Sequence, residues 1–313
     1  MIGLSNSYYG NGWRKQMVES FTEAAENAKK AGYIKDYVIQ NGDGTVNAQI
    51  AQINSFILRG VNAIAINAAS PTALNSVIQK ALDAGIVVVA FDSIIEGLDD
   101  VYTMDYDFYS MGEKKTEYVM ERLGGKGNVV VVRGVSGSSP DIGVYNGIMS
   151  VLNKYPDVKK VTEIYGEASA TVSQENMLKV LPSLPEIDAV ITFCGNDSIG
   201  VVNAFEQSAR EVPIVIGDNT AEFMNWWIAK KKENNYQTLS VNSTPSCGSA
   251  AVWVVLNILN KIDVPKKMLM SLIYITQDEA EKYSDLKPGT IASPYFSNDD
   301  VVKDIIVPAR QAK

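Results

Sequence analysis

The chain has 313 residues, of which 46% are hydrophobic and 20% charged, and its net charge at pH 7 is −8. This length predicts about two domains, and the acidic balance weighs against nucleic acid or an anionic membrane surface as a partner. The sequence contains no histidine, which excludes Ser-His-Asp and Cys-His nucleophile systems and histidine-based metal sites. Carboxylate-only or lysine chemistry stays possible, but an enzyme is the least expected class, and we expect no cofactor and no metal site.

The sequence leaves open where the protein is located and whether its two cysteines are bonded. No apolar run reaches the roughly 18 residues that span a bilayer. The chain opens on Met1-Ile2-Gly3-Leu4, which predicts a strand rather than a cleavable signal, so the protein is either cytoplasmic or exported with its signal already removed. Cys194 and Cys247 fit no metal-site spacing, and whether they form a disulfide stays open.

Strand and helix patterns alternate through the first 123 residues. The apolar run 85–91, rich in β-branched residues and ending in Asp92, is typical of a strand buried on both faces of a parallel sheet. Gly32 predicts the end of one helix, and Ser70-Pro71 the start of another. The expected strands are 2–6, 37–40, 63–67, 85–91 and 101–105, and the expected helices are 13–31, 45–59, 71–84 and 109–123.

A loop at 124–127 separates this pattern from a second one of the same kind, which ends in an irregular tail. The expected strands are 129–133, 161–165, 189–193, 214–217, 238–241 and 269–275, and the expected helices are 141–154, 172–181, 199–208, 221–232 and 246–260. Two successive βαβαβ sets with right-handed crossovers predict an α/β fold of two doubly wound, Rossmann-like lobes with parallel sheets.

Asn or Asp follows nearly every predicted strand. Each one alone is equally typical of a turn or a helix cap. Ligands, however, bind in the crevice at the carboxyl ends of such strands, and the recurrence in both halves indicates a cleft for a neutral, hydroxyl-rich molecule. The candidate ligand-binding residues are Ser7, Asn11, Trp13 and Arg14 in the first loop, and Asn67, Asp92, Asp105, Asn196, Asp218 and Asn242 at later strand ends.

A glycine-rich loop over 134–139 follows a strand and precedes a helix, as phosphate-binding loops do. It lacks the Lys-Ser/Thr ending of a P-loop and the complete dinucleotide glycine pattern. Phosphate binding is therefore the weaker interpretation of this loop.

With these residues the chain resembles the sugar-binding proteins of ABC importers, of the ribose- and galactose-binding type (type I periplasmic binding proteins). The order and spacing of several blocks carry the resemblance, rather than any one of them. The blocks are Ser7…Asn11…Trp13, Arg59-Gly60-Val61…Ile66-Asn67, 86–92, Gly134…Gly137-Ser138-Ser139…Gly147, Ala189-Val190…Asn196-Asp197 and 214–218.

The resemblance implies two lobes that close on a sugar-like ligand by hinge motion and deliver it to a membrane permease, with no chemistry performed. It implies three crossovers, near Asp105, Asn242 and Ile275. One lobe would comprise residues 1–105 and 243–275, and the other residues 106–242 and 276–313. A monomer, located in the periplasm or lipid-anchored at the cell surface, is the corresponding expectation.

Residue by residue, the resemblance makes Asn11 and Trp13 the first-lobe wall of the cleft, and Asn242 a hinge residue. Hydroxyls of the ligand would be bound by Asn67 and Asp92 in one lobe and by Asn196 and Asp218 in the other.

The chain departs from the family at two positions where an Arg is usual, which here hold Ser93 and Ile142. The second of these arginines normally makes paired hydrogen bonds to sugar oxygens. We hypothesise that Arg14 supplies the missing guanidinium. The alternative is that Arg14 points to water.

Two further interpretations stay open. Sensor domains of signalling receptors have the same two-lobed architecture, and so do LacI-type regulators, which carry an N-terminal helix-turn-helix that this sequence lacks.

Overall fold

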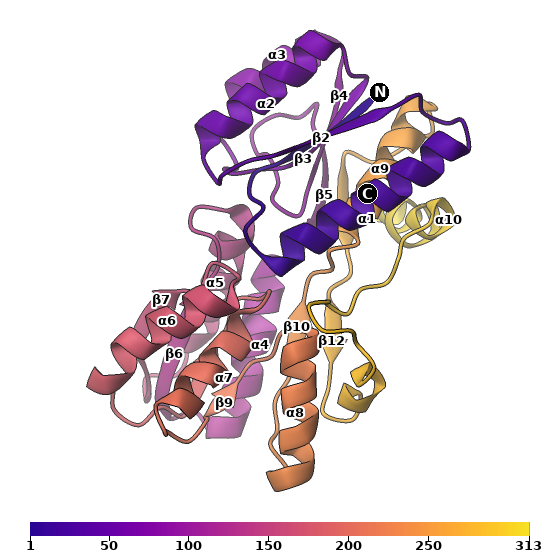
Figure 1. Cartoon of the computed structure of the whole chain (residues 1–313). Helices are drawn as coiled ribbons and strands as arrows, with labels where there is room; N and C mark the ends of the chain where they lie inside the picture. The colour runs from indigo at the N-terminus through magenta and orange to yellow at the C-terminus, as the bar shows by residue number, and fades with distance from the viewer. Residues whose placement is uncertain (313) are drawn as a thin grey trace.

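The computed structural model describes residues 1–312. The chain folds into two lobes, one above the other in Figure 1, each built on a parallel β-sheet. The first lobe has a six-stranded sheet in the order β11-β5-β4-β3-β1-β2, and all neighbours are parallel. Its strands are β1 Ile2–Asn6, β2 Tyr37–Asn41, β3 Ala63–Asn67, β4 Val87–Phe91, β5 Tyr102–Tyr106 and β11 Lys267–Met270.

The second lobe has a four-stranded parallel sheet in the order β7-β6-β8-β9. The antiparallel pair β10-β12 continues it, because Gly217, two residues after β9, forms a parallel bridge with Ser240. The strands are β6 Gly127–Arg133, β7 Val158–Tyr165, β8 Ala189–Ile191, β9 Ile214–Val215, β10 Ser240–Asn242 and β12 Ile273–Ile275. The predicted fold of two doubly wound lobes is confirmed.

Helices cover both faces of each sheet. In the first lobe α1 packs with α9 and α2 packs with α3, and in the second lobe α4 packs with α5 and α6 with α7. The helices are α1 Gly12–Lys30, α2 Val46–Arg59, α3 Asn75–Asp83, α4 Phe108–Leu123, α5 Ser139–Leu152, α6 Ala170–Val180, α7 Asp197–Gln207, α8 Ala221–Asn234, α9 Cys247–Leu259, α10 Asn298–Val301 and α11 Val307–Gln311.

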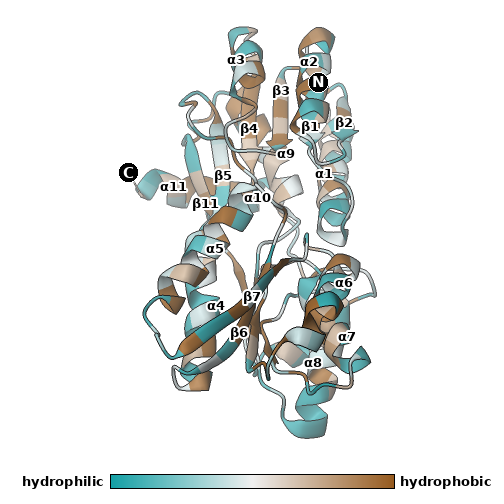
Figure 2. Ribbon diagram, turned by 90° about the vertical axis from the view of Figure 1, so that its left-hand side faces the viewer, coloured by the Kyte–Doolittle hydropathy of each residue, from teal (hydrophilic) through white to brown (hydrophobic). Residues whose placement is uncertain are grey.

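The strands are apolar without a break because both of their faces are buried. Along β3, Ala63 and Ala65 belong to the core that α1 and α9 share, whereas Ile64 and Ile66 belong to the core under α2 and α3. Figure 2 shows the same division, with brown in interior strands such as β3 and teal along the exposed sides of helices such as α1 and α8. The carboxyl ends of the strands in both sheets point at the junction of the lobes.

Two expectations about local structure are wrong. Ser70 does not start a helix, because its Oγ accepts the N–H of Ala73 at 3.2 Å in a turn and α3 begins only at Asn75. The expected strand 269–275 is two strands in different lobes, since β11 pairs with β5 and β12 pairs with β10.

The end of the chain also differs from the expected division into lobes. Residues 276–313 are expected in the second lobe, and this is wrong for α10 and α11, which pack on α9 and β11 of the first lobe (Figure 2). Val301, Ile305 and Ile306 are buried there in the same core as Val255. Beyond the three expected crossovers, the chain therefore crosses once more, after Ile291.

This last crossover is fastened to both lobes. Ile291 forms an antiparallel bridge with Thr220 of the second lobe. The side chain of Gln16 on α1 accepts the N–H of Ile291 at 2.8 Å and donates to its carbonyl at 2.9 Å. Gln16 thus binds Ile291 itself from the first lobe. On the other side, the carbonyl of Thr290 accepts the N–H of Ala221, and the N–H of Ala292 donates to the carbonyl of Asn219, each at 2.9 Å.

Candidate functional site

A cavity of about 30 Å³ lies between the lobes, at the carboxyl ends of β1, β4, β6 and β8. This volume is close to that of one water molecule. Its two charged lining residues, Arg14 and Asp92, both come from the first lobe. The remaining lining residues are Asn11, Trp13 and Ser93 of the first lobe, Phe108 and Ser243 at the crossovers, and Val135, Ser138, Pro140, Ala168, Phe193, Cys194 and Gly195 of the second lobe.

Asp92 is held in a fixed orientation at the end of β4. Its φ of 59° is left-handed, which is uncommon for a residue other than glycine and occurs often at functional sites. Its Oδ2 accepts hydrogen bonds from Asn67 at 3.1 Å and from Ser93 at 3.4 Å, and its Oδ1 accepts one from Ser243 at 3.5 Å. Burial raises the pKa of Asp92, and the charge of Arg14 acts against this rise.

Arg14 lies in the first turn of α1, which Asn11 caps by accepting the N–H of Arg14 at 2.8 Å. Its exposed fraction is 5%, so the alternative that Arg14 points to water is wrong. The guanidinium donates to Oδ1 of Asn6 at 3.2 Å and to Oγ of Ser93 at 3.3 Å. Burial lowers the pKa of Arg14, and the charge of Asp92 acts against this change.

A hydroxyl group lies between these two charges. Ser93 Oγ accepts a hydrogen bond from Arg14 and donates one to Asp92, so one O–H group bridges the guanidinium and the carboxylate. A hydroxyl is both donor and acceptor, whereas a carboxylate only accepts and a guanidinium only donates. The first-lobe side of the cavity therefore presents a charged donor and a charged acceptor to one hydroxyl group, that of Ser93.

The second-lobe side of the cavity is mainly apolar. Its lining residues include Phe193 and Ala168 but no charged side chain. Ala168 and its neighbour Glu167 both have left-handed backbone, with φ of 53° and 57°. This conformation brings the carbonyl of Glu167 within 3.5 Å of Asn11 Nδ2, so the two walls are in contact.

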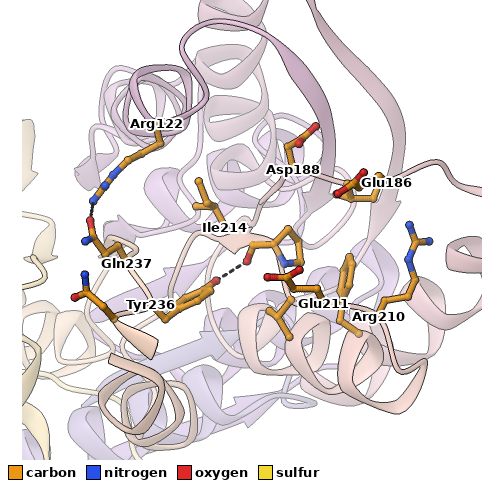
Figure 3. A pocket seen from close by; sticks show the side chains of 13 residues that line it. Arg122, Glu186, Asp188, Arg210, Glu211, Ile214, Tyr236 and Gln237 are labelled. Carbon is orange, nitrogen blue, oxygen red and sulfur yellow. Dashed lines mark hydrogen bonds between the residues drawn. The ribbon is translucent and has the colours of Figure 1, made fainter. Parts of the chain in front are cut away.

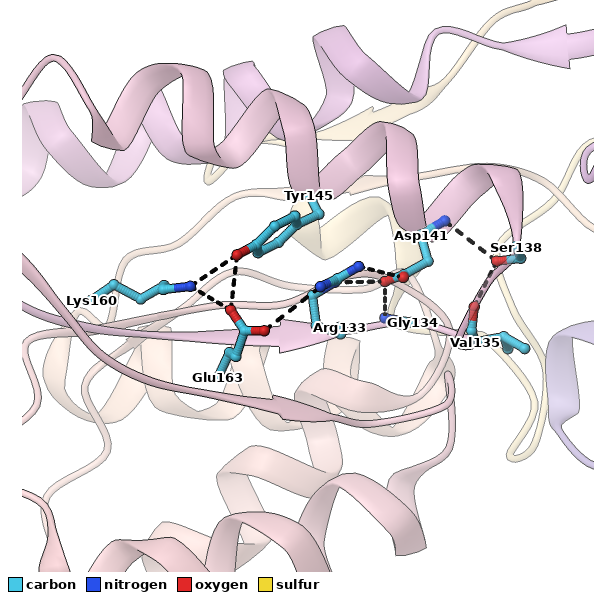
Figure 4. A network of polar contacts seen from close by, with 8 residues as sticks. All are labelled: Arg133, Gly134, Val135, Ser138, Asp141, Tyr145, Lys160 and Glu163. Carbon is cyan, nitrogen blue, oxygen red and sulfur yellow. Dashed lines mark hydrogen bonds and ion pairs between the residues drawn. The ribbon is translucent and has the colours of Figure 1, made fainter.

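A charged network fixes the glycine-rich loop that supplies Val135 and Ser138. The guanidinium of Arg133 bonds both oxygens of Asp141, at 3.0 and 2.6 Å, and Asp141 Oδ1 also accepts the N–H of Gly134 at 2.8 Å (Figure 4). Arg133 lies 3.8 Å from the ring centroid of Tyr145. The loop is therefore bound at its start and at the first turn of α5 without any phosphate.

A larger hollow, about 550 Å³, lies at the opposite end of the second lobe (Figure 3). It lies away from the carboxyl ends of the sheets, and several of its polar side chains bind other groups of the protein. Arg122 bonds Gln237, Arg210 donates to the carbonyl of Pro185, and Tyr236 Oη joins the carbonyl of Pro213 to the N–H of Val215. We therefore regard the cavity between the lobes as the candidate ligand site.

Comparison with known proteins agrees with this architecture. Residues 2–263 match the periplasmic binding protein domain. The chain belongs to this family. A solved solute-binding protein of an ABC transporter from Thermobispora bispora has a TM-score of 0.92 to it at 35% identity, covering 99% of this chain and 96% of that one.

Two curated relatives are more distant. A xylitol-binding protein of Mycolicibacterium smegmatis is 29% identical over 205 residues, which is 65% of this chain and 58% of the relative. The multiple sugar-binding periplasmic receptor ChvE of Rhizobium radiobacter is 27% identical over 227 residues, which is 65% of this chain and 64% of the relative. The chain thus matches less than two thirds of the length of these relatives.

Four of the predicted site residues line the cavity of this periplasmic binding protein, namely Asn11, Trp13, Arg14 and Asp92. Asn67 lies one step behind them, because its Nδ2 donates to Asp92 and its Oδ1 is buried with no partner. Asn196 directly follows the lining residue Gly195, and its Oδ1 is likewise buried without a partner.

The other four predicted residues lie away from the cavity. Asp218 accepts from the N–H and hydroxyl of Thr220 and from the N–H of Ser198, and Asn242 donates to Asn219 at 2.6 Å. Both side chains therefore order the backbone near the crossovers.

Ser7 and Asp105 complete this group. Ser7 is buried, and its carbonyl accepts the N–H of Gly44. Asp105 lines a separate groove of about 400 Å³ beside the first crossover, together with Ile142, where the family usually has Arg. Burial raises the pKa of Asp105 to about 7.

Sequence reasoning missed the aromatic residues Phe108 and Phe193, the hydroxyl of Ser243 and a buried lysine, Lys115. A signal for Lys115 was available, because Met111, Lys115 and Val119 recur at the four-residue spacing of the buried face of α4. No helix within residues 1–312 is long and apolar enough to cross a bilayer, and no group of three metal-binding side chains occurs in that part of the chain.

Proposed function

We propose that this chain is the solute-binding component of an ABC importer, and that it captures a small, neutral, polyhydroxylated ligand between its lobes. The observation that carries the proposal is the hydroxyl of Ser93 between Arg14 and Asp92. A ligand hydroxyl can make the same pair of contacts, accepting from the guanidinium and donating to the carboxylate. The opposite charges of the two residues favour a ligand without net charge.

The aromatic residues favour a ligand with an apolar face. Trp13, Phe108 and Phe193 line the same cavity, and aromatic faces cover the C–H surface of a sugar or polyol. A cavity of 30 Å³ is far below the 300 Å³ or so of ordinary ligand sites, so the lobes must separate for such a ligand to enter and then close on it.

The family and the curated relatives support the physiological part of the proposal. Both relatives are named for binding a polyol or sugars, and the solved homologue is a solute-binding protein of an ABC transporter. We propose the same setting here, an extracytoplasmic monomer that delivers its ligand to a membrane permease and performs no catalysis.

A thermal-shift screen tests the proposal directly. Pentoses, hexoses, furanoses, polyols such as xylitol and nucleosides form the test set, with amino acids and short peptides as the comparison set. A ligand at 100 times its Kd adds about 2.7 kcal/mol to the stability and so raises the Tm. The proposal fails if no compound of the test set raises the Tm while an amino acid or peptide does.

A further inference from the structure

Lys115 is a fully buried lysine that does not itself line the cavity. It lies on the side of α4 that packs against β8, and none of its surface is exposed. Its Nζ donates to the carbonyl oxygen of Thr192 at 3.2 Å and to that of Phe193. Both partners are neutral groups.

This position is unfavourable for a charged side chain. Burial lowers the pKa of Lys115 to about 8, although Cys194, Asp218 and Asp197 act against that change from the neighbouring elements. A buried charge costs free energy unless it is paired, and an unbranched apolar side chain such as Met can fill a similar space. Stability alone therefore gives no reason for a lysine at this position.

The groups that Lys115 binds belong to the second-lobe wall of the cavity. Thr192 and Phe193 follow β8 directly, and residues 193–195 line the cavity. Asp197, two residues beyond this segment, accepts at 3.2 Å the N–H of Ser169, which directly follows the lining residue Ala168. Two carbonyl groups of this wall are thus fixed by the single ammonium group of Lys115.

We propose that Lys115 is a positioning residue of the ligand site, which holds the segment 192–195 so that Phe193 meets the ligand in one fixed arrangement. Charge-assisted hydrogen bonds are shorter and stronger than neutral ones, so an ammonium fixes two carbonyl groups better than a neutral side chain would. The inference rests on the proposed function, in that it assumes a ligand between the lobes.

The test compares Lys115→Met with Lys114→Met, which removes the same charge from the exposed neighbour of Lys115. The measurements are the Tm, the hydrogen exchange of the amides of 192–195, and the Kd for whichever sugar or polyol of the screen raises the wild-type Tm most. We expect K115M to have an equal or higher Tm, faster exchange at 192–195 and a Kd at least tenfold weaker. K114M should leave all three measurements unchanged.

A pH series separates positioning from mere packing. As the pH rises from 7 to 9.5, the wild-type affinity should fall because Lys115 loses its proton, whereas the affinity of K115M should stay level. Among the groups that face Lys115, Asp218 has a pKa of about 6, below this window, and burial raises the pKa values of Cys194 and Asp197. Because burial raises the pKa of the Asp197 carboxyl, Asp197→Asn is measured in parallel and should keep the wild-type pH dependence.

An unchanged Kd in K115M overturns the inference, and so does a lower Tm with faster exchange throughout the second lobe. Lys115→Gln, which keeps a neutral donor, gives the same comparison if the Met variant does not fold. If the wild type binds no sugar or polyol, the proposed function fails, and the Tm and exchange of K115M still judge the role of Lys115.

Discussion

Asp92→Asn is the substitution that most directly tests the site. It keeps the shape of the side chain, and Asn tolerates the left-handed backbone that Asp92 adopts at φ 59°. It removes the charge that opposes Arg14 and replaces one acceptor oxygen by a donor. A hydrogen bond to a charged group contributes about 1.5–3 kcal/mol, so the loss of one ligand contact should weaken the Kd by about 10- to 150-fold. Isothermal titration with the ligand from the screen measures this change.

Asp218→Asn is the matched control. Asp218 is equally buried, but its carboxylate accepts from Thr220 and Ser198 and does not line the cavity. We expect D218N to lower the Tm, because an amide group cannot accept all of these hydrogen bonds, and to change the Kd little. Unchanged affinity in D92N together with a large loss in D218N would refute our assignment of the site.

Three further predictions follow from other parts of the molecule. Arg14→Met should weaken binding at least tenfold in the same titration, and equal affinity would remove Arg14 from the site. Asp105→Asn should raise the Tm at pH 8 but not at pH 4. Burial raises the pKa of Asp105 to about 7, so the ionised carboxylate destabilises the folded protein. This destabilisation grows as the pH rises from about 4 to 7 and is fully present above 7. The same Tm difference between D105N and wild type at both pH values would contradict this. Gly112→Ala should lower the free energy of unfolding by about 1–3 kcal/mol in a urea titration, because the new Cβ would lie 2.1 Å from the carbonyl oxygen of Val144 on α5. An unchanged urea midpoint would show that α4 and α5 can separate without cost.

The sequence predicted the fold and the first-lobe half of the site, for a physical reason. Strands buried on both faces are apolar without interruption, so the polar residue that ends such a strand is visible, as Asp92 is. The first loop could be assigned in the same way, and Asn11, Trp13 and Arg14 all line the cavity.

The same signal could not separate binding residues from residues that cap the backbone. Asp92 and Asp218 both end buried strands, yet the hydroxyl and N–H of Thr220 occupy Asp218. Whether Asp92 or Asp218 points into a cavity depends on the conformation of the residues after the strand and on the rotation of the strand. A local sequence pattern encodes neither. The aromatic residue Phe108 was missed because its helix begins at a crossover, where lobe geometry decides what the first turn meets.

The tail could not be assigned to a lobe from its sequence. Residues 298–311 form short helical segments around Pro308, too short to show a clear period. Their place is decided by the apolar surface that α9 leaves for Val301 and Ile306, which is a tertiary property.

The binding of Ile291 to both lobes has a mechanical consequence. Gln16 and the segment 219–221 cannot move apart without breaking their hydrogen bonds to residues 290–292, so a rotation that keeps these bonds has its axis close to that segment. Displacement in such a rotation grows with distance from the axis, and a small angle at Ile291 becomes a wide opening at the far rim. A substitution at Gln16, which does not line the cavity, should therefore change how readily the two lobes separate.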